Sequence, residues 1–343
     1  MSSVSVAMAT WNGEQHLREQ LESIGRQTLL PCELVVSDDA STDATIEIIE
    51  QFARTAPFPV RVHAGQDRIG VGENFMRAAQ RCSGDLIAFS DQDDVWLPEK
   101  LERCAASLGL PEVVLAIHAC SVVDETLRPL GEIVPTIARD RISSPLEPPR
   151  WGEAPGMGMV FSLDLLSLLE WDSRPVAHHA HGRLLHDEWI YGIARVAGSI
   201  AFLAEPHCLY RQHSANIEGA PERGAGAWMR SATTTGGVYY GRRAEQARQW
   251  AALLAGAAEQ RAPEEELAAR LRGEARSYER LADALEQRVL VYEAGQSRGR
   301  RLRAVARALG SGTYRSRRRE GFGLRGLARD TTMIVGGRTG SAR

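Results

Sequence analysis

The sequence lacks any apolar run long enough to cross a membrane. A spanning helix needs about 20 apolar residues, and no stretch of the 343 residues approaches that length. The first residues, Met1 to Ala9, also lack the basic region followed by a long apolar stretch that marks a secretion signal. We therefore expect a protein that is neither secreted nor transmembrane and that works in the cytoplasm.

Cysteine is scarce as well. The five cysteines stand at positions 32, 82, 104, 120 and 208, without a C-x-x-C pair and without the density of a disulfide framework. We expect reduced thiols in a cytosolic setting, and most of these side chains are predicted to be small buried apolar groups.

Charge is distributed unevenly along the chain. The apolar content of 43% is enough for a sizeable core, and no internal repeat is evident. Residues 298–343 contain 13 arginines but only Glu320 and Asp330 as acids, so this segment carries +11. The net charge of −3 leaves −14 for residues 1–297. The C-terminal part is therefore predicted to be a basic extension.

The first 120 residues alternate short apolar runs with segments of helical period, which is typical of a sheet covered by crossover helices. Strands are expected at residues 4–9, 34–37, 60–62 and 86–89. Helices are expected from Gly13, after a cap at Ser41 or Thr42, from Glu73 to Arg81, and around Pro98. The pattern predicts an α/β fold.

The pattern changes after residue 120. Residues 121–155 are rich in proline and charge and are predicted to form a loop, followed by an apolar helical segment through Leu169. A helix is expected at 186–196, a short strand at 200–203 and a loop at 210–219. From about residue 224 the composition is helical without strand signals. We expect two parts, a main domain of residues 1–223 and a helical, arginine-rich extension of residues 224–343.

An acidic string, Asp91-Gln92-Asp93-Asp94, lies just past the fourth expected strand. Open α/β sheets bind ligands in the crevice outside the carboxyl ends of their strands. Mg²⁺ or Mn²⁺ needs oxygen ligands clustered in this way, and a diphosphate is the natural partner of such an ion. The alternative is a solvated acidic turn, since short motifs recur by chance. A calcium loop of the EF-hand type is disfavoured because its alternating acids, central glycine and terminal glutamate are missing.

A second acidic group, Asp38-Asp39-Ala40-Ser41-Thr42-Asp43, follows the second expected strand. Helix capping alone explains Ser41, Thr42 or Asp43. Asp38 and Asp39 are expected to project from the strand's carboxyl end into the same crevice. There a carboxylate can accept hydrogen bonds from a base N–H or a ribose hydroxyl.

Several segments together resemble family 2 glycosyltransferases with the GT-A fold, a Rossmann-like mixed sheet flanked by helices. The resemblance is carried by V-A-M-A-T-W-N-G from Val6, the D-D-x-S-x-D string and D-Q-D-D-V-W-L-P from Asp91. The string S-D-Q-D-D-V-W, with His186-Asp187-Glu188-Trp189 and Tyr210-Arg211-Gln212-His213, is similar to the rhamnosyltransferase-like branch. The resemblance is close over residues 3–219 and weaker through Leu309-Gly310-Ser311 and Tyr314-Arg315.

The resemblance implies a metal-dependent enzyme that takes a sugar from a dTDP- or UDP-sugar donor, with rhamnose suggested. It implies that Thr10, Trp11 and Asn12 line the nucleoside pocket and that Asp39 recognises uracil or thymine. Gly70 and Asp91 are placed on the donor nucleotide as well. Asp93, with Asp91 nearby, is implied to hold Mg²⁺ or Mn²⁺ on the diphosphate, and His213 to reach the metal or the diphosphate.

The resemblance also implies an acceptor side. Asp187 matches the family's catalytic base, which takes the acceptor's proton during a direct, inverting displacement without a covalent enzyme intermediate. Gly156 and Met157 match the family's acceptor-side glycine segment. The acceptor implied is a glycan or lipid-linked glycan in cell-envelope polysaccharide synthesis. Arg68 departs from the family, where an asparagine is expected.

Each of these residues has a plainer interpretation. Asp187 stands in the first turn of an expected helix, where an acid stabilises the helix dipole. His213 can be a loop histidine with ordinary partners, and Gly156 with Met157 can be a turn. A histidine cluster at 178, 179, 181 and 186 suggests zinc, but its irregular spacing disfavours a structural zinc site.

The basic tail contains Arg315-Ser316-Arg317-Arg318-Arg319. Such a segment can bind anionic lipid, so we expect peripheral attachment to the inner face of the membrane; the alternative is a solvated helix face. No nucleic acid partner is expected, because no recognised motif accompanies the charge.

Two other functions compete with sugar transfer. A phosphoryl-transfer enzyme with Asp91 or Asp93 as nucleophile would favour a hydroxyl residue close behind, but Val95 and Trp96 follow. A catalytically silent nucleotide-binding or scaffold protein is the remaining alternative, and the presence of Asp93 and Asp187 argues against it. The sugar, the acceptor and its linkage are left open.

Overall fold

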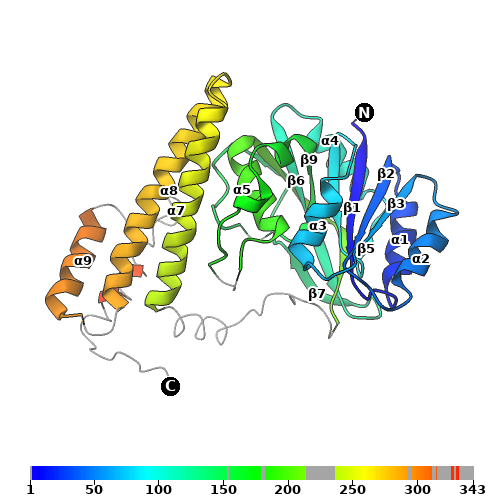
Figure 1. The fold of residues 1–343 in the computed structure, drawn as a ribbon, viewed down its shortest axis with the longest axis horizontal. Helices are drawn as coiled ribbons and strands as arrows, with labels where there is room; N and C mark the ends of the chain where they lie inside the picture. Colours follow the sequence, from blue (N-terminus) through cyan, green and yellow to red (C-terminus); the bar gives the residue numbers. More distant parts are fainter. Residues whose placement is uncertain are drawn as a thin grey trace. The chain divides into compact units, whose positions relative to one another are not determined.

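The chain folds into two units (Figure 1). The computed structural model describes residues 2–152, 154–178, 182–213, 236–292, 296–310, 314, 326–327 and 330–331. One unit consists of Met1–Asp172 and Leu185–Pro221, and the other of Ser173–Leu184 and Glu222–Arg343. The predicted domain boundary between residues 223 and 224 lies outside the described residues.

Parallel strands form the first half of the sheet in the first unit. β1 (Val4–Thr10) pairs in parallel with β2 (Glu33–Asp38) and β4 (Leu86–Ser90), and β3 (Val60–Ala64) pairs in parallel with β2. All seven residues of β1 are buried, as expected for a strand covered on both faces. α1 (Leu17–Gly25), α2 (Thr45–Ala53) and α3 (Val71–Ala79) connect these strands. The predicted βαβ alternation is confirmed.

The second half of the sheet is mixed. β9 (Met159–Ser162) lies antiparallel between β4 and β6 (Val113–Val123), and β10 (Ser199–Arg211) runs parallel to β6. β5 (Val95–Trp96) and β8 (Arg141–Ser143) pair antiparallel with β10, and β7 (Pro129–Val134) pairs antiparallel with β6. The order along the main path is β3-β2-β1-β4-β9-β6-β10-β5.

Four sequence predictions are wrong in this unit. The predicted loop 121–155 contains the end of β6 and all of β7 and β8, and the segment after Gly158 begins with strand β9 in place of a helix. Short apolar runs do not distinguish a buried strand from a helix. β10 continues to Arg211, with register shifts around Pro206, and a bulge lets a strand pass a proline. α2 begins only at Thr45, whose N–H donates to Asp43 Oδ1 at 3.0 Å, so Ser41 and Thr42 are not its caps.

Helices cover both faces of the sheet (Figure 1). On one face Val6 and Met8 of β1 share a core with Leu17 and Leu21 of α1, and α2 and α4 (Lys100–Leu108) pack into the same core. On the other face α3 and α5 (His186–Ala197) meet β4. The carboxyl ends of β1, β2 and β4 therefore open at one edge between the two helical layers.

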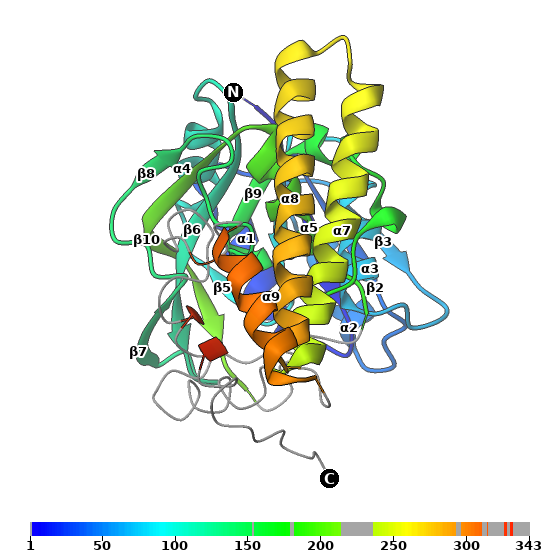
Figure 2. The ribbon, with the colours of Figure 1, turned by 90° about the vertical axis from the view of Figure 1, so that its left-hand side faces the viewer.

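The described C-terminal part of the second unit consists mainly of helices. α7 (Gly237–Gln260) and α8 (Glu265–Tyr292) run side by side (Figure 2), with the Trp250 and Tyr278 rings stacked 6.0 Å apart. α9 (Arg298–Gly310) packs on α8 through Val305 and Val291. The helical character predicted for the C-terminal part is thus observed, whereas Arg315–Arg319 lie outside the described residues. No helix of the described residues is long and apolar enough to cross a bilayer.

A buried carboxylate ties a C-terminal residue to α8. Asp330 is fully buried and accepts hydrogen bonds from Arg288 Nε at 2.8 Å and Nη2 at 2.7 Å. The hydroxyls of Tyr292 and Tyr314 donate to the same carboxylate at 2.7 and 2.5 Å. Both carboxylate oxygens are thus satisfied, as a buried charge requires.

Replacing Asp330 with alanine tests this tie. We expect Asp330→Ala to lower the free energy of unfolding by about 3–5 kcal/mol, because it leaves the buried Arg288 guanidinium without its carboxylate. The measurement is urea denaturation followed by far-ultraviolet circular dichroism. Asp283→Ala is the matched control: its partner Arg248 is at the surface and the Asp283 side chain is 66% exposed, so a change of only about 0–1 kcal/mol is expected. Equal effects of the two variants would contradict the role given to Asp330.

Candidate functional site

The nucleoside side of the candidate site is built at the ends of β1 and β2. Asp39 is buried, and its two oxygens accept the N–H groups of Ile69 at 2.6 Å and Gly70 at 2.9 Å. Gly70 has φ of +92°, a conformation that favours glycine. Asp39 thus fixes the loop before α3 and keeps acceptor capacity for one more donor, since each carboxylate oxygen has two lone pairs.

Asp38 and Thr10 are hydrogen-bonded to each other next to this region. Both are buried, and Thr10 Oγ1 donates to Asp38 Oδ1 at 2.8 Å. Asp38 also accepts the N–H of Ser41 at 2.8 Å and its hydroxyl at 2.5 Å. The Asp38 carboxylate is therefore engaged in local bonds, and of the two neighbouring acids Asp39 is the better placed to meet a ligand.

Trp11 and Asn12 follow at the end of β1. Gln92 clamps the Trp11 backbone in both directions: Trp11 N donates to Gln92 Oε1 at 2.8 Å, and Gln92 Nε2 donates to Trp11 O at 3.0 Å. Asn12 has φ of 45°, and its Oδ1 accepts the N–H of Thr42 at 2.8 Å. The predicted nucleoside residues are thus held against the ends of both β2 and β4.

Arg68, found where the resemblance leads us to expect an asparagine, contacts both Trp11 and Asp39. The Arg68 guanidinium lies over the Trp11 ring, 3.5 Å from its centroid, and its Nε is 4.0 Å from Asp39 Oδ2. Arginine stacks readily on indole. A face of the Trp11 ring is therefore covered by the Arg68 cation.

The acidic turn after β4 brings like charges together. Burial, with the negative charges of Asp93 and Asp187, raises the pKa of Asp91 to about 7, and the positive charge of Lys100 acts in the opposite direction. Asp93 Oδ2 lies 2.9 Å from His213 Nε2. The structure therefore brings Asp93 and His213 into contact from segments 120 residues apart, and the charge of Asp187 acts on Asp91.

Asp94 and Arg211 are structural partners of this turn. Asp94 is fully buried and accepts the Arg211 N–H at 3.1 Å, and burial, with the neighbouring Cys208 and acidic charges, raises its pKa well above the usual range. The buried Arg211 guanidinium donates to the carbonyls of Asp93 at 2.7 Å and Glu125 at 2.6 Å and to Glu19 Oε2 at 2.5 Å. Arg211 thus anchors the acidic turn to β10, the β6–β7 connection and α1.

Asp187 stands in the first turn of α5. Its Oδ1 accepts the Glu188 N–H at 2.8 Å, and Glu188 Oε2 accepts the Leu185 N–H at 3.2 Å. His186 is buried, stacks on Phe75 with ring centroids 3.9 Å apart, and places the start of α5 beside β4. A first-turn acid is consistent with helix stabilisation, but its charge also reaches Asp91.

The glycine segment forms a 3₁₀ turn, Gly156–Gly158, directly before β9. A Cβ on Gly156 would lie 2.6 Å from His186 Nε2 and 3.6 Å from Asp187 Cβ, so this position has no room for a side chain. Met157 is buried in the core, and its carbonyl accepts Lys100 Nζ at 2.6 Å. Gly156 therefore packs against the start of α5, while the Met157 side chain points into the core.

In the described residues, no group of three or more His, Cys, Asp or Glu side chains is arranged to hold a metal ion. Mg²⁺ is commonly bound by one or two carboxylates together with substrate phosphates, so a complete protein cage is not required. Burial, and then the charges of Asp93 and Asp187, raise the pKa of Asp91, and a divalent cation at the site would offset both effects. Asp91 and Asp93 fit such an ion, with His213 beside Asp93.

The histidines considered for zinc do not form one group. His178 belongs to the second unit, where its Nδ1 lies 2.9 Å from Gln246 Oε1. His186 belongs to the first unit, and residues 179 and 181 lie outside the described chain.

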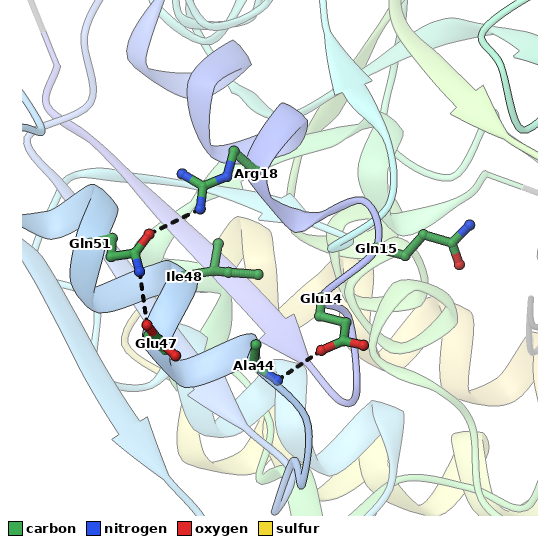
Figure 3. A pocket seen from close by; sticks show the side chains of 7 residues that line it. All are labelled: Glu14, Gln15, Arg18, Ala44, Glu47, Ile48 and Gln51. Carbon is green, nitrogen blue, oxygen red and sulfur yellow. Dashed lines mark hydrogen bonds between the residues drawn. The ribbon is translucent and has the colours of Figure 1, made fainter.

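A groove of about 660 Å³ lies between α1 and α2 (Figure 3). Its polar side chains bond to their neighbours: Arg18 donates to Gln51 at 3.0 Å, Gln51 donates to Glu47 at 3.0 Å, and Glu14 accepts the Ala44 N–H at 3.0 Å. None of the predicted site residues lines this groove. The candidate site is the edge at the strand ends.

Sequence reasoning did not assign roles to Gln92, Lys100 or Arg211, although each of them fixes part of this edge. Gln92 and Arg211 lie within the two motifs, but the motifs alone do not indicate their hydrogen-bond partners. Lys100 lies two residues beyond Pro98, and only its partner Met157 reveals its position.

Comparison with known proteins places the chain in a family. The family model described as Glycosyl transferase family 2 matches residues 5–159. The dTDP-rhamnosyl transferase RfbG of Shigella flexneri is 30% identical over 220 residues, which cover 62% of this chain and 74% of that protein. An uncharacterized glycosyltransferase, alr2836, of Nostoc sp. is 28% identical over 217 residues, covering 62% of this chain and 66% of that protein.

Solved structures identify the fold. The structure of S. aureus TarS 1–349 matches with a TM-score of 0.56 at 17% identity, covering 97% of this chain and 92% of that one. The predicted GT-A fold, a mixed sheet flanked by helices with a helical C-terminal part, is confirmed. With the 30% identical relative and the matching family model, the chain belongs to glycosyl transferase family 2.

Proposed function

We propose that this protein is an inverting glycosyltransferase that moves a sugar from a nucleoside-diphosphate donor to a hydroxyl of a glycan or lipid-linked acceptor. The observation that carries the proposal is the position of the acidic turn after β4. Gln92 of this turn bonds the Trp11 backbone in both directions, and Asp93 Oδ2 lies 2.9 Å from His213 Nε2. The negative charge of Asp187 acts on Asp91 in the same turn. Donor ligands and a base for the acceptor would then share one edge. A relative that is a dTDP-rhamnosyl transferase and a structural neighbour, TarS, solved in complex with UDP-GlcNAc support a nucleotide-sugar donor, with rhamnose as a candidate sugar.

In this proposal the donor lies along the ends of β1, β2 and β4. Asp39 and Trp11 bind the nucleoside, while Asp91 and Asp93, with His213 beside Asp93, would hold Mg²⁺ or Mn²⁺. When bound, such an ion supplies positive charge that stabilises a departing diphosphate. The adjoining loop held by Asp39 and Gly70 completes the donor side.

Asp187 is the proposed general base. It accepts the acceptor hydroxyl's proton as that oxygen bonds to the anomeric carbon, and the bond from that carbon to the diphosphate oxygen breaks. The electron pair leaves with the nucleoside diphosphate, and the configuration inverts. Gly156, packed against His186 and Asp187 without a side chain, borders the proposed acceptor side.

The setting proposed is cell-envelope polysaccharide synthesis, with residues 1–223 as the catalytic domain and 224–343 as its extension. The named relatives include putative glycosyltransferases EpsE and TuaG of Bacillus subtilis, the latter for teichuronic acid biosynthesis. Contact of the basic tail with an anionic membrane surface belongs to the proposal. Failure to sediment with phosphatidylglycerol vesicles at low salt would remove that part.

Nucleotide binding provides the first test. We expect calorimetric titration with dTDP and UDP to show Mn²⁺-dependent binding of at least one, weakened by about tenfold or more in Asp93→Asn, because a neutral amide binds the ion less well. Asp85→Asn, at the other end of β4 and bonded to Ser3, is the control and should bind as wild type does. Absence of binding by the wild type would overturn the donor assignment in favour of a silent scaffold.

Replacing the proposed base gives a second test. Asp187→Asn should lower the release of nucleoside diphosphate during sugar transfer by about 10²–10⁴-fold, the range for losing a general base, while nucleotide affinity is kept. Asparagine can still accept the Glu188 N–H, so α5 should begin as before. Glu188→Gln, whose side chain faces the Leu185 N–H, is the control in the same turn. Unchanged turnover in Asp187→Asn would refute its role as base.

The electrostatic cost of the site gives a third test. Because the pKa of Asp91 is raised from its ordinary 3.8 to about 7, the folded state holds its proton more tightly than the unfolded chain. Ionising Asp91 therefore costs stability, and this cost is absent below about pH 4, grows as pH rises, and is complete above about pH 7.

We accordingly expect Asp91→Asn, in the presence of a chelator, to stabilise the protein by about 1–3 kcal/mol at pH 8 and hardly at all at pH 4.5. Urea denaturation followed by tryptophan fluorescence measures both values. For Asp85, hydrogen bonds from Ser3 lower the pKa of the carboxyl, so Asp85→Asn should show no such gain. The same stabilisation by Asp91→Asn at both pH values would contradict the electrostatic explanation.

A further inference from the structure

The sequence contains one lysine among 343 residues, although lysine and arginine together number 41. That residue is Lys100, the first residue of α4, and its side chain is fully buried. The other cationic positions are all arginine. A buried ammonium is costly unless it is bonded. The surroundings of Lys100 show what this one ammonium does.

Lys100 joins two segments that are far apart in the sequence. Its Nζ donates to the Met157 carbonyl at 2.6 Å, across 57 residues, and lies 3.4 Å from the centroid of the Trp96 ring in β5. Its positive charge also reaches the carboxyls of Asp91 and Asp94. One buried cation therefore contacts the turn before β9 and is attracted to the acidic turn after β4.

The turn that Lys100 holds is next to the proposed base. Gly156, the neighbour of Met157, packs so closely on the start of α5 that a Cβ would lie 2.6 Å from His186 Nε2. The same Cβ would lie 3.6 Å from Asp187 Cβ. A shift of the Gly156–Gly158 turn would therefore change the position of Asp187.

We infer that Lys100 is a positioning residue that fixes the Gly156–Gly158 turn, and through it Asp187, relative to Asp91 and Asp93. This inference rests on the proposed function for the roles of the three acids. It assigns no chemical step to Lys100, whose nitrogen is occupied by the Met157 carbonyl and the Trp96 ring. The positioning requires both the N–H donor and the charge of Lys100. The donor bonds the Met157 carbonyl, and the charge attracts the carboxylates of Asp91 and Asp94.

Lys100→Met tests the inference, since methionine fills a similar volume without a donor or a charge. We expect amide hydrogen exchange in residues 155–162, measured by mass spectrometry on the full chain, to accelerate by about tenfold or more, because the buried Met157 carbonyl loses its donor. Exchange in β1 and β2 should stay as in wild type. Affinity for dTDP or UDP with Mn²⁺ should change by less than about threefold.

Turnover separates positioning from a structural role. With dTDP-rhamnose as donor and water as acceptor, Lys100→Met should lower kcat for dTDP release by about tenfold or more and leave KM for the donor unchanged. Arg61→Met is the matched control: it removes a cation that donates to the Arg81 carbonyl at 2.6 Å and pairs with Glu33, away from the turn. That variant should keep kcat and the exchange of residues 155–162.

Three outcomes would overturn the inference. They are unchanged exchange of residues 155–162 in folded Lys100→Met, unchanged kcat, and a parallel loss of nucleotide affinity and stability. If Lys100→Met does not fold, two other variants replace it: Lys100→Arg, which keeps the donor and the charge, and Lys100→Gln, which is neutral. Amide exchange at residues 155–162 should be slower in Lys100→Arg than in Lys100→Gln. Slower exchange in Lys100→Gln would refute the inference. Failure of the proposed function would appear separately, as a wild type that binds neither nucleotide.

Discussion

The burial of carboxylates at the open edge of the sheet is the constraint on which the candidate site depends. Burial makes ionisation of Asp91 costly and raises its pKa, and the negative charges of Asp93 and Asp187 add to that cost. No local hydrogen-bond pattern requires these acids to meet. Two buried cations bond the backbone of this region: Lys100 donates to the Met157 carbonyl and Arg211 to the Asp93 carbonyl. Burying these acids therefore lowers the free energy of unfolding, and a divalent cation with a diphosphate would offset that loss in the proposed site.

Arg211 links the end of β10 to other parts of the first unit. The guanidinium at the end of β10 reaches the Asp93 carbonyl, the Glu125 carbonyl and Glu19, and so connects residues up to 192 positions apart. The two-residue strand β5 pairs with β10 just before this point. The end of β10 therefore places the Arg211 guanidinium at the acidic turn, and the chain continues from there to His213 beside Asp93.

The sequence was sufficient for the parts of the fold with a clear period and insufficient where long-range contacts decide. β1, β2, β3 and β4 were predicted within two residues at each end, because buried parallel strands read as short apolar runs between amphipathic helices. β9 was read as helix, because a four-residue apolar run has no period of its own. In the site the carboxylates were identified from their order in the motif. Lys100, Gln92 and Arg211 were not, because their partners lie 57 to 192 residues away.

The departure at Arg68 fits the same electrostatic logic on the donor side. Asp39 is buried with both oxygens directed at the loop N–H groups, and Arg68 adds a positive charge 4.0 Å away while covering Trp11. The Arg68 side chain is 52% exposed, so moving it costs little beyond one cation–π contact of about 0.5–1 kcal/mol. In the proposed donor site, a nucleobase lying against Trp11 would have to displace this guanidinium, and the freed cation could then pair with the diphosphate. Arg68 is therefore compatible with the proposed donor site.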